Sequence, residues 1–193
     1  MRPICAKWGL RSRKRLKRRK ATRNYHTELR GPALNATAII CGVGTKPNYK
    51  STLANPPVIV IPCGASKQAH RAIAGRMYTG SYHKACLRWA LTNTDANHVY
   101  ILSAKYGLLG LQDVIKPYNL VMGQPGSVTV AVVSQQAHDR GLLAADVIGI
   151  GGRKYTGVIR VVWPNADTPL DHVGGMGNQL QWMKQHAHYR NPK

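Results

Sequence analysis

The segment 62–67, which reads PCGASK, carries residues whose types and spacing suit nucleophilic or anion-binding chemistry. A cysteine thiolate is a nucleophile and a lysine ammonium nearby stabilises it, so we expect Cys63 and Lys67 to be catalytic. Gly64 permits a close approach of the backbone, and the successive amides around Gly64 and Ser66 can form an anion-binding nest. The alternative for Cys63 is a small residue of the core, because unpaired cysteines are often buried.

The segment 103–109 (SAKYGLL) brings a hydroxyl, an ammonium and a phenol together in a short stretch. Tyr106 offers a face on which a base can stack, and Lys105 offers a charge for a phosphate. We expect Ser103, Lys105 and Tyr106 to bind a ligand.

Asp113 follows this segment in a chain where acidic residues are rare, 7 among 193. An acid beside a lysine and a tyrosine can hydrogen-bond a ribose hydroxyl or the edge of a base, and we count Asp113 among the expected catalytic residues. The alternative is an aspartate that forms a turn or caps a helix.

Other patterns in the sequence indicate no metal centre. The chain has 8 histidines, but it contains neither HExxH nor CxxC, and we expect no metal and no cofactor. The glycines at 174, 175 and 177 precede a predicted helix. They either hold an anion at its N-terminus or only make a turn.

These residues need a scaffold, and hydrophobic periodicity predicts it. Strands are expected over residues 58–61, 98–103, 146–150 and 158–163, and helices over 81–93 and 177–188. Residues 127–139 fit either a helix or a strand. Strands separated by segments of helix length predict an α/β fold, a three-layer sandwich with a mostly parallel sheet.

The predicted topology also places the site. In open parallel sheets, ligands bind at the carboxyl ends of the strands. The segments 62–67 and 103–110 follow two strands that we expect to be parallel neighbours. We therefore predict that both line one pocket.

The charge of the chain is strongly positive, with a formal net charge of +21. Residues 11–20 read RSRKRLKRRK, and such a run suits a polyanion because each neutralised phosphate releases a counterion. We expect nucleic acid, DNA or RNA, to bind through Arg11, Arg13, Lys14, Arg15, Lys17, Arg18, Arg19 and Lys20. The alternatives are a solvated tail, an upstream start codon or a transit peptide.

Domain organisation follows from the same composition. We expect residues 1–55 to form a basic arm, mobile without nucleic acid, and a linker with one edge strand near 38–43, and residues 56–193 to form the α/β domain. No apolar run is long enough to cross a membrane, and the four cysteines show no disulfide framework, so a cytoplasmic location without a membrane partner is expected.

Three longer segments carry a resemblance. They read PCGASK (62–67), YILSAKYGLLGLQDVIKPYNLVMG (100–123) and GGMGNQLQWMK (174–184). Together they resemble an uncharacterised bacterial and phage family with PCGxxK and LSAKYGL motifs. They are more distantly similar to the YaaA-type peroxide-stress proteins and to the core domain of archaeosine synthase. Asn119 stands where the peroxide-stress proteins have an arginine.

The resemblance implies an α/β fold related to uracil-DNA glycosylases and a link to modified nucleobases, such as 7-deazaguanine, or to DNA protection. Carried over by position, it implies a site made of Cys63, Lys67, Ser103, Lys105, Tyr106, Gly107, Asp113 and Tyr118. Two functions remain open. One is an enzyme acting on a nucleobase or nucleotide, and the other is a non-catalytic module that binds DNA or a nucleotide.

Overall fold

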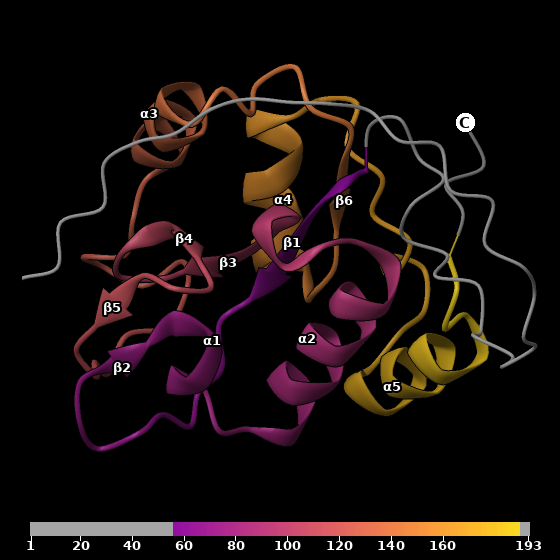
Figure 1. Cartoon of the computed structure of the whole chain (residues 1–193), viewed down its shortest axis with the longest axis horizontal. Coiled ribbons are helices and arrows are strands. Elements are labelled where there is room, and N and C mark those ends of the chain that lie inside the picture. Colours follow the sequence, from indigo (N-terminus) through magenta and orange to yellow (C-terminus); the bar gives the residue numbers. More distant parts are fainter. Residues whose placement is uncertain (1–55, 190–193) are drawn as a thin grey trace, which may run out of the picture. The chain divides into compact units, whose positions relative to one another are not determined.

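A computed structural model describes residues 56–189. Its central sheet has four strands in the order β4-β3-β1-β6 (Figure 1). They span Val58–Pro62 (β1), Val99–Ser103 (β3), Gly107–Gly110 (β4) and Val147–Gly149 (β6). Strand β1 pairs in parallel with both β3 and β6, whereas β4 runs antiparallel to β3. A separate antiparallel pair joins β2 (Ala72–Ile73) to β5 (Val114–Ile115).

The central strand β1 is buried on both faces, as its unbroken apolar sequence predicts. Ile59 and Ile61 belong to one core cluster, and Val58 and Val60 belong to the other. Because successive side chains of a strand point to opposite faces, β1 contributes to the cores on both sides of the sheet.

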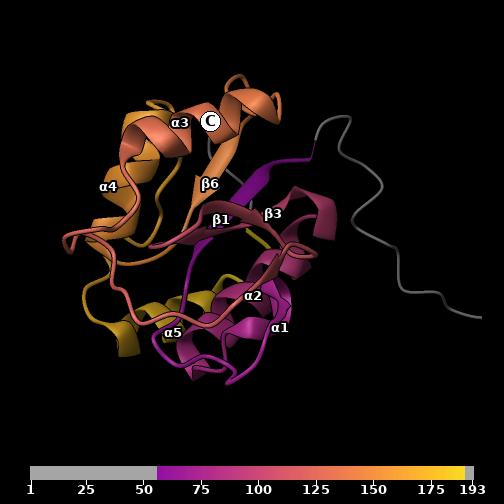
Figure 2. The same ribbon diagram turned by 90° about the vertical axis from the view of Figure 1, so that its left-hand side faces the viewer.

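Helices cover both faces of this sheet, which gives the three layers visible in Figure 2. One face carries α1, α2 and α5, and the other carries α3 and α4. The helices span Ala74–Met77 (α1), Ser81–Asn93 (α2), Val130–Asp139 (α3), Arg153–Val162 (α4) and Met176–Gln185 (α5), and a short 3₁₀ turn, η2, spans Ala96–His98. The α/β class and the mostly parallel sheet are therefore confirmed.

Most predicted elements are present within a few residues of their expected bounds, and residues 127–139 contain the helix α3. One prediction is wrong: residues 158–163 lie mostly in the helix α4 and form no strand. The side chains of Thr156, Ile159 and Val162 are buried at a spacing of three, which is helical. The β-branched residues misled the prediction because tertiary packing overrides local propensity.

A second correction concerns the segment 104–110, where no strand was expected. Its second half is the edge strand β4. Gly107 has a φ of +77°, and its left-handed backbone turns the chain so that Gly107 pairs with Ser103. This tight hairpin leaves only residues 104–106 as a loop.

Several expectations fall outside the described residues. The basic segment 11–20, the patch at 38–43 and the predicted mobility of the arm belong to the part of the chain before residue 56. Within residues 56–189, no helix combines the length and apolar character needed to span a membrane.

Candidate functional site

A cavity of about 760 Å³ lies at the carboxyl ends of β1 and β6. Its walls come from the segment after β1, the first turns of α2, α4 and α5, and the segment that precedes α5. The lining includes Cys63, Gly64, Ser66, Gly80, Tyr82, His83, Gly152, Arg153, Tyr155, Leu170, Asp171, Gly175, Met176 and Gln179. This is the place in an open α/β sheet where ligands are expected.

Cys63 lies directly beyond β1, on the floor of this cavity. Its amide donates a hydrogen bond to the carbonyl of Leu102, 3.1 Å away, which continues the pairing of β1 with β3. Its Sγ lies 3.1 Å from the hydroxyl of Tyr155 on α4. The residue is half-buried, so a ligand in the cavity can reach its thiol.

The hydroxyl groups of Tyr78, Tyr118 and Ser103 form a hydrogen-bonded network near Cys63. The hydroxyl of Tyr118 lies 2.8 Å from Ser103 Oγ and 3.0 Å from the hydroxyl of Tyr78. Burial raises the pKa of Tyr78 to about 12, and burial together with the nearby charge of Cys63 also raises the pKa values of Tyr118 and Tyr155. All three phenols therefore keep their protons at neutral pH and can act as donors.

Lys67 places its ammonium over this tyrosine group. Its Nζ lies 4.2 Å from the ring centroid of Tyr118 and 5.9 Å from that of Tyr78, and it donates to the carbonyl of Ala65. Partial burial lowers the pKa of Lys67, and the negative charge of Cys63 opposes that effect. Lys67 therefore interacts electrostatically with Cys63, but it is not among the residues that line the cavity.

His83 is a buried residue of the cavity wall. The side chain is 2% exposed, and its Nδ1 lies 2.9 Å from the carbonyl of Pro62. A carbonyl only accepts, so Nδ1 carries the proton and Nε2 presents a lone pair. Burial lowers the pKa of His83, which keeps the ring neutral. Nε2 has no hydrogen-bond partner among the described residues.

The second predicted segment lies behind the cavity and contributes no residue to its lining. Ser103 Oγ accepts hydrogen bonds from the amides of Lys105 and Tyr106, at 3.2 and 3.0 Å. The ring of Tyr106 packs edge-on against Tyr118, and the side chain of Lys105 is exposed. The two strands are parallel neighbours as predicted, but the prediction that both segments line one pocket is wrong for this cavity.

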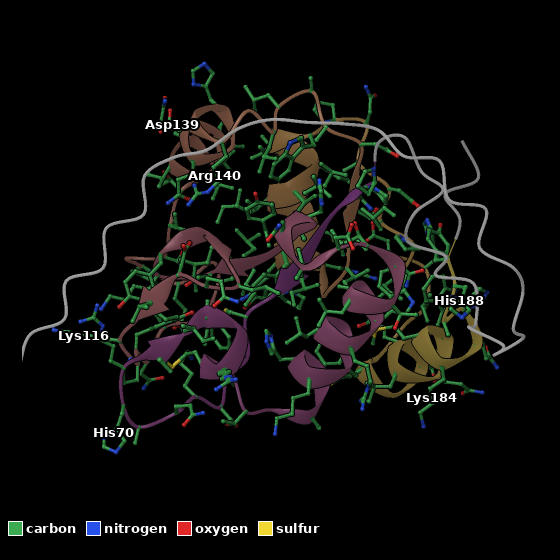
Figure 3. The ribbon with its side chains drawn as sticks, in the orientation of Figure 1. His70, Lys116, Asp139, Arg140, Lys184 and His188 are labelled. Carbon is green, nitrogen blue, oxygen red and sulfur yellow. The ribbon has the colours of Figure 1, made fainter. Side chains whose placement is uncertain are left out.

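Asp113 and Gly107 make contacts that shape turns. Asp113 Oδ2 accepts a hydrogen bond of 2.9 Å from the amide of Gly110 and lies 3.8 Å from Arg140, which Figure 3 shows at the end of α3. Gly107 lies against the side chain of Gln136. The amide group of Gln136 accepts a hydrogen bond from the backbone N–H of Leu108 and donates one to the backbone carbonyl of Tyr106. These contacts favour the turn-forming alternative for Asp113.

Sequence reasoning missed Tyr155, His83 and Arg153. The signal available for the first and third was the Gly151-Gly152 pair that follows the predicted strand 146–150. Because residues 158–163 were expected to form a strand, no helix N-terminus was placed there. His83 carried no signal of its own within the expected helix 81–93. Within residues 56–189, no group of three His, Cys, Asp or Glu side chains could hold a metal.

With this fold and cavity in place, comparison with known sequences assigns the chain to a class. The sequence model of a family of unknown function, DUF6884, matches residues 58–185, and the chain belongs to that family. The match confirms the resemblance to an uncharacterised family.

A more distant similarity links the chain to a curated protein. It is 45% identical over 60 residues to a "UPF0246 protein" of Shewanella denitrificans. The aligned segment covers 31% of this chain and only 23% of that relative, so the chain spans less than a quarter of its length. This similarity agrees with the more distant resemblance to YaaA-type proteins.

Proposed function

We propose that this protein is an enzyme that acts on a nucleobase or nucleotide bound in the Cys63 cavity, and that its basic segment 11–20 brings it to nucleic acid. The observation that carries the proposal is the position of the Cys63 thiol, which faces the cavity and lies 3.1 Å from the hydroxyl of Tyr155. A cysteine that serves only the core, such as Cys86, is fully buried.

The groups around Cys63 suit addition to an electrophilic carbon of a base, such as the nitrile carbon of a 7-deazaguanine. In that addition, sulfur forms a bond to carbon, the π electrons of the carbon–nitrogen bond move to nitrogen, and the thiol proton ends on that nitrogen. The hydroxyl of Tyr155 lies within hydrogen-bonding distance of the sulfur, and Lys67 interacts electrostatically with Cys63.

A second candidate is a binding module without chemistry. The carboxylate of Asp171, which lines the cavity, is occupied by Thr156, Thr168 and an ion pair with Arg160. It is therefore a poor general base, and catalysis depends on Cys63. If Cys63 forms no bond with a substrate, the binding module is the better description.

The test uses iodoacetamide on the full chain, with and without guanine, a 7-deazaguanine nitrile, nucleosides and nucleotides. Occupancy of the cavity slows alkylation of Cys63, and a covalent addition adds the mass of the base to the intact protein. The adduct is absent from Cys63→Ala, and calorimetry shows that this variant still binds. If none of these compounds slows alkylation, the proposed function is wrong.

A further inference from the structure

Three helices direct their N-termini at the same cavity. The residues that precede α2, α4 and α5 are Gly80, Gly152 and Gly175, and all three line it. None of these helices has a side chain that caps its first turn. By contrast, α3 lies away from the cavity, and the Thr129 hydroxyl caps it by accepting from the amide of Val132.

The backbone does not require glycine at these positions. Gly80, Gly152 and Gly175 have φ values of −64°, −76° and −67° with extended ψ, a conformation open to any residue. A Cβ on any of them would meet nothing within 4 Å. Serine, threonine or aspartate there would cap the helix. Glycine instead leaves the amides of three first turns accessible from one space.

Side-chain contacts hold these helix ends together. The hydroxyl of Tyr82 on α2 donates to Gln179 Oε1 on α5 at 2.5 Å, and Gln179 Nε2 donates to the carbonyl of Gly174. Thr156 on α4 donates to Asp171, which precedes α5. The arrangement is therefore built into the fold.

Charge in the cavity favours an anion. Arg153, the first residue of α4, lines it with an exposed side chain. Asp171 is the acid in the lining, and its carboxylate pairs with Arg160. Each helix N-terminus adds a partial positive charge and unpaired amide donors, the combination that binds phosphate groups.

His83 indicates, independently of the helix N-termini, that the ligand carries a hydrogen-bond donor as well as an anionic group. Its buried Nε2 has no partner among residues 56–189, although the residue lines the cavity. A buried acceptor left unpaired is costly, and a ligand hydroxyl or ring N–H would satisfy it. An anion alone does not supply that donor, whereas a nucleotide carries a phosphate, sugar hydroxyls and base N–H groups.

We infer that the cavity takes a phosphate-bearing mononucleotide, not a free base or nucleoside. The first turns of α2, α4 and α5 hold the phosphate, and His83 Nε2 accepts from a donor on the sugar or base. This inference rests on the proposed function, because it names the substrate class of the same site. The cavity volume of about 760 Å³ lies in the range for such ligands.

The experiment measures protection of Cys63 from iodoacetamide, a neutral reagent that does not compete for an anion site. The probes are inorganic phosphate, four nucleoside 5′-monophosphates (GMP, AMP, CMP and UMP) and the four matching nucleosides. Because the readout is local to Cys63, binding of nucleotides to the basic segment 11–20 does not register. In each of three proteins, protection by a monophosphate is compared with protection by its nucleoside. The proteins are the wild type, Gly152→Asp and the matched control Thr129→Asp, which places the same charge at the N-terminus of α3.

At least one monophosphate protects Cys63 at a concentration about tenfold lower than its nucleoside does, since three helix ends act on one anion. Gly152→Asp folds, because its side chain meets open space, and it loses this advantage. Thr129→Asp keeps the advantage.

Other outcomes overturn specific claims. Equal protection by nucleosides and monophosphates refutes the phosphate site and leaves the proposed function standing. The phosphate site is also refuted, and the proposed function stands, if a monophosphate still protects Gly152→Asp better than its nucleoside does. If inorganic phosphate protects as well as every monophosphate and no nucleoside protects, the anion site stands but the nucleotide assignment and the proposed function both fail. Failure of every probe to protect overturns the mononucleotide inference, and the proposed function also fails if guanine and the 7-deazaguanine nitrile do not protect Cys63.

Discussion

The thiol of Cys63 lies 3.1 Å from the hydroxyl of Tyr155, although 92 residues separate them in sequence. Cys63 follows the central strand β1, and Tyr155 lies in the first turn of α4, so the pair exists only because β6 places α4 beside β1. If Tyr155 donates to the thiolate, Tyr155→Phe slows alkylation of Cys63 by about tenfold, the value of one hydrogen bond to a charged group. A time course of alkylation, with samples quenched and analysed by mass spectrometry, measures the rate.

The matched control is Tyr100→Phe, which removes the hydroxyl of another partly buried tyrosine packed against the same core cluster as Tyr155. It leaves the alkylation rate within about twofold of the wild type, since no hydrogen bond to the sulfur is removed. Equal rates for Tyr155→Phe and the wild type would show that the hydroxyl accepts from the thiol and does not stabilise its anion.

Two cysteines of the described region should differ sharply in reactivity. Cys63 faces the cavity, whereas Cys86 is fully buried in α2, and burial raises the pKa of Cys86 to about 12. At pH 8, iodoacetamide therefore labels Cys63 and leaves Cys86 unmodified, as measured by peptide mass spectrometry. Labelling of both in urea is the positive control. Modification of Cys86 before Cys63 in the native protein would contradict the described burial.

Gly107 provides a test of a structural role against a ligand-binding one. Its φ of +77° disfavours any side chain, and a Cβ would collide with the side chain of Gln136. Gly107→Ala is expected to lower the free energy of unfolding by about 3 kcal/mol, from backbone strain and overpacking together. Urea denaturation followed by circular dichroism measures the change.

Gly126→Ala is the control, because Gly126 has a φ of +81° but a Cβ there meets nothing within 4 Å. It should cost about 1 kcal/mol, the strain alone. If the two variants lose equal stability, the packing against Gln136 contributes nothing to the cost of the substitution.

Parts of the fold that depend on local sequence could be predicted. The run Val58–Ile61 predicts a buried central strand because only a strand covered on both faces is apolar at every position. The helix α4 could not be predicted in the same way. Its buried face includes Thr156, and its Val and Ile residues suit a strand equally well, so the apolar pattern does not distinguish the two.

Some features of the candidate site could likewise be predicted from the sequence, and others could not. The proximity of Cys63 and Ser103 follows from parallel strands whose ends meet, which topology predicts. The convergence of three helix N-termini depends on where each helix packs in the fold, and the sequence shows only a glycine immediately before each helix. The role proposed for His83 rests on a missing hydrogen-bond partner, which no sequence pattern reveals.

The basic segment 11–20 is expected to supply salt-sensitive affinity for nucleic acid. Deleting residues 1–30 should reduce the slope of log binding constant against log salt by up to about one unit for each phosphate that the segment neutralises. Fluorescence anisotropy with DNA and RNA oligonucleotides at several salt concentrations measures it. The control is a variant with Lys184→Gln, which removes one exposed charge from α5 (Figure 3) and changes the slope by at most about one unit. An unchanged slope after the deletion excludes this segment as the binding element.

The neutral state of His83 makes stability depend on pH. Burial lowers the pKa of His83 from its ordinary value of 6.5, so the unfolded chain binds more protons than the folded one between the two pKa values. The contribution is fully present above pH 6.5 and is lost as the pH falls toward the folded pKa, by up to about 1.4 kcal/mol per pH unit. Urea denaturation at pH 7.5, 6.5 and 5.5 measures the slope.

His83→Gln should be less stable than the wild type at pH 7.5, because the bond to the Pro62 carbonyl is weakened, but its stability should change less between pH 7.5 and 5.5. The control for the loss of an imidazole is His138→Gln, since His138 is exposed on α3. A ligand that donates to Nε2 needs the neutral ring, so binding should weaken over the same pH interval. If His83→Gln and the wild type lose equal stability on acidification, folding does not change the pKa of His83, and the claim that burial keeps its ring neutral is refuted.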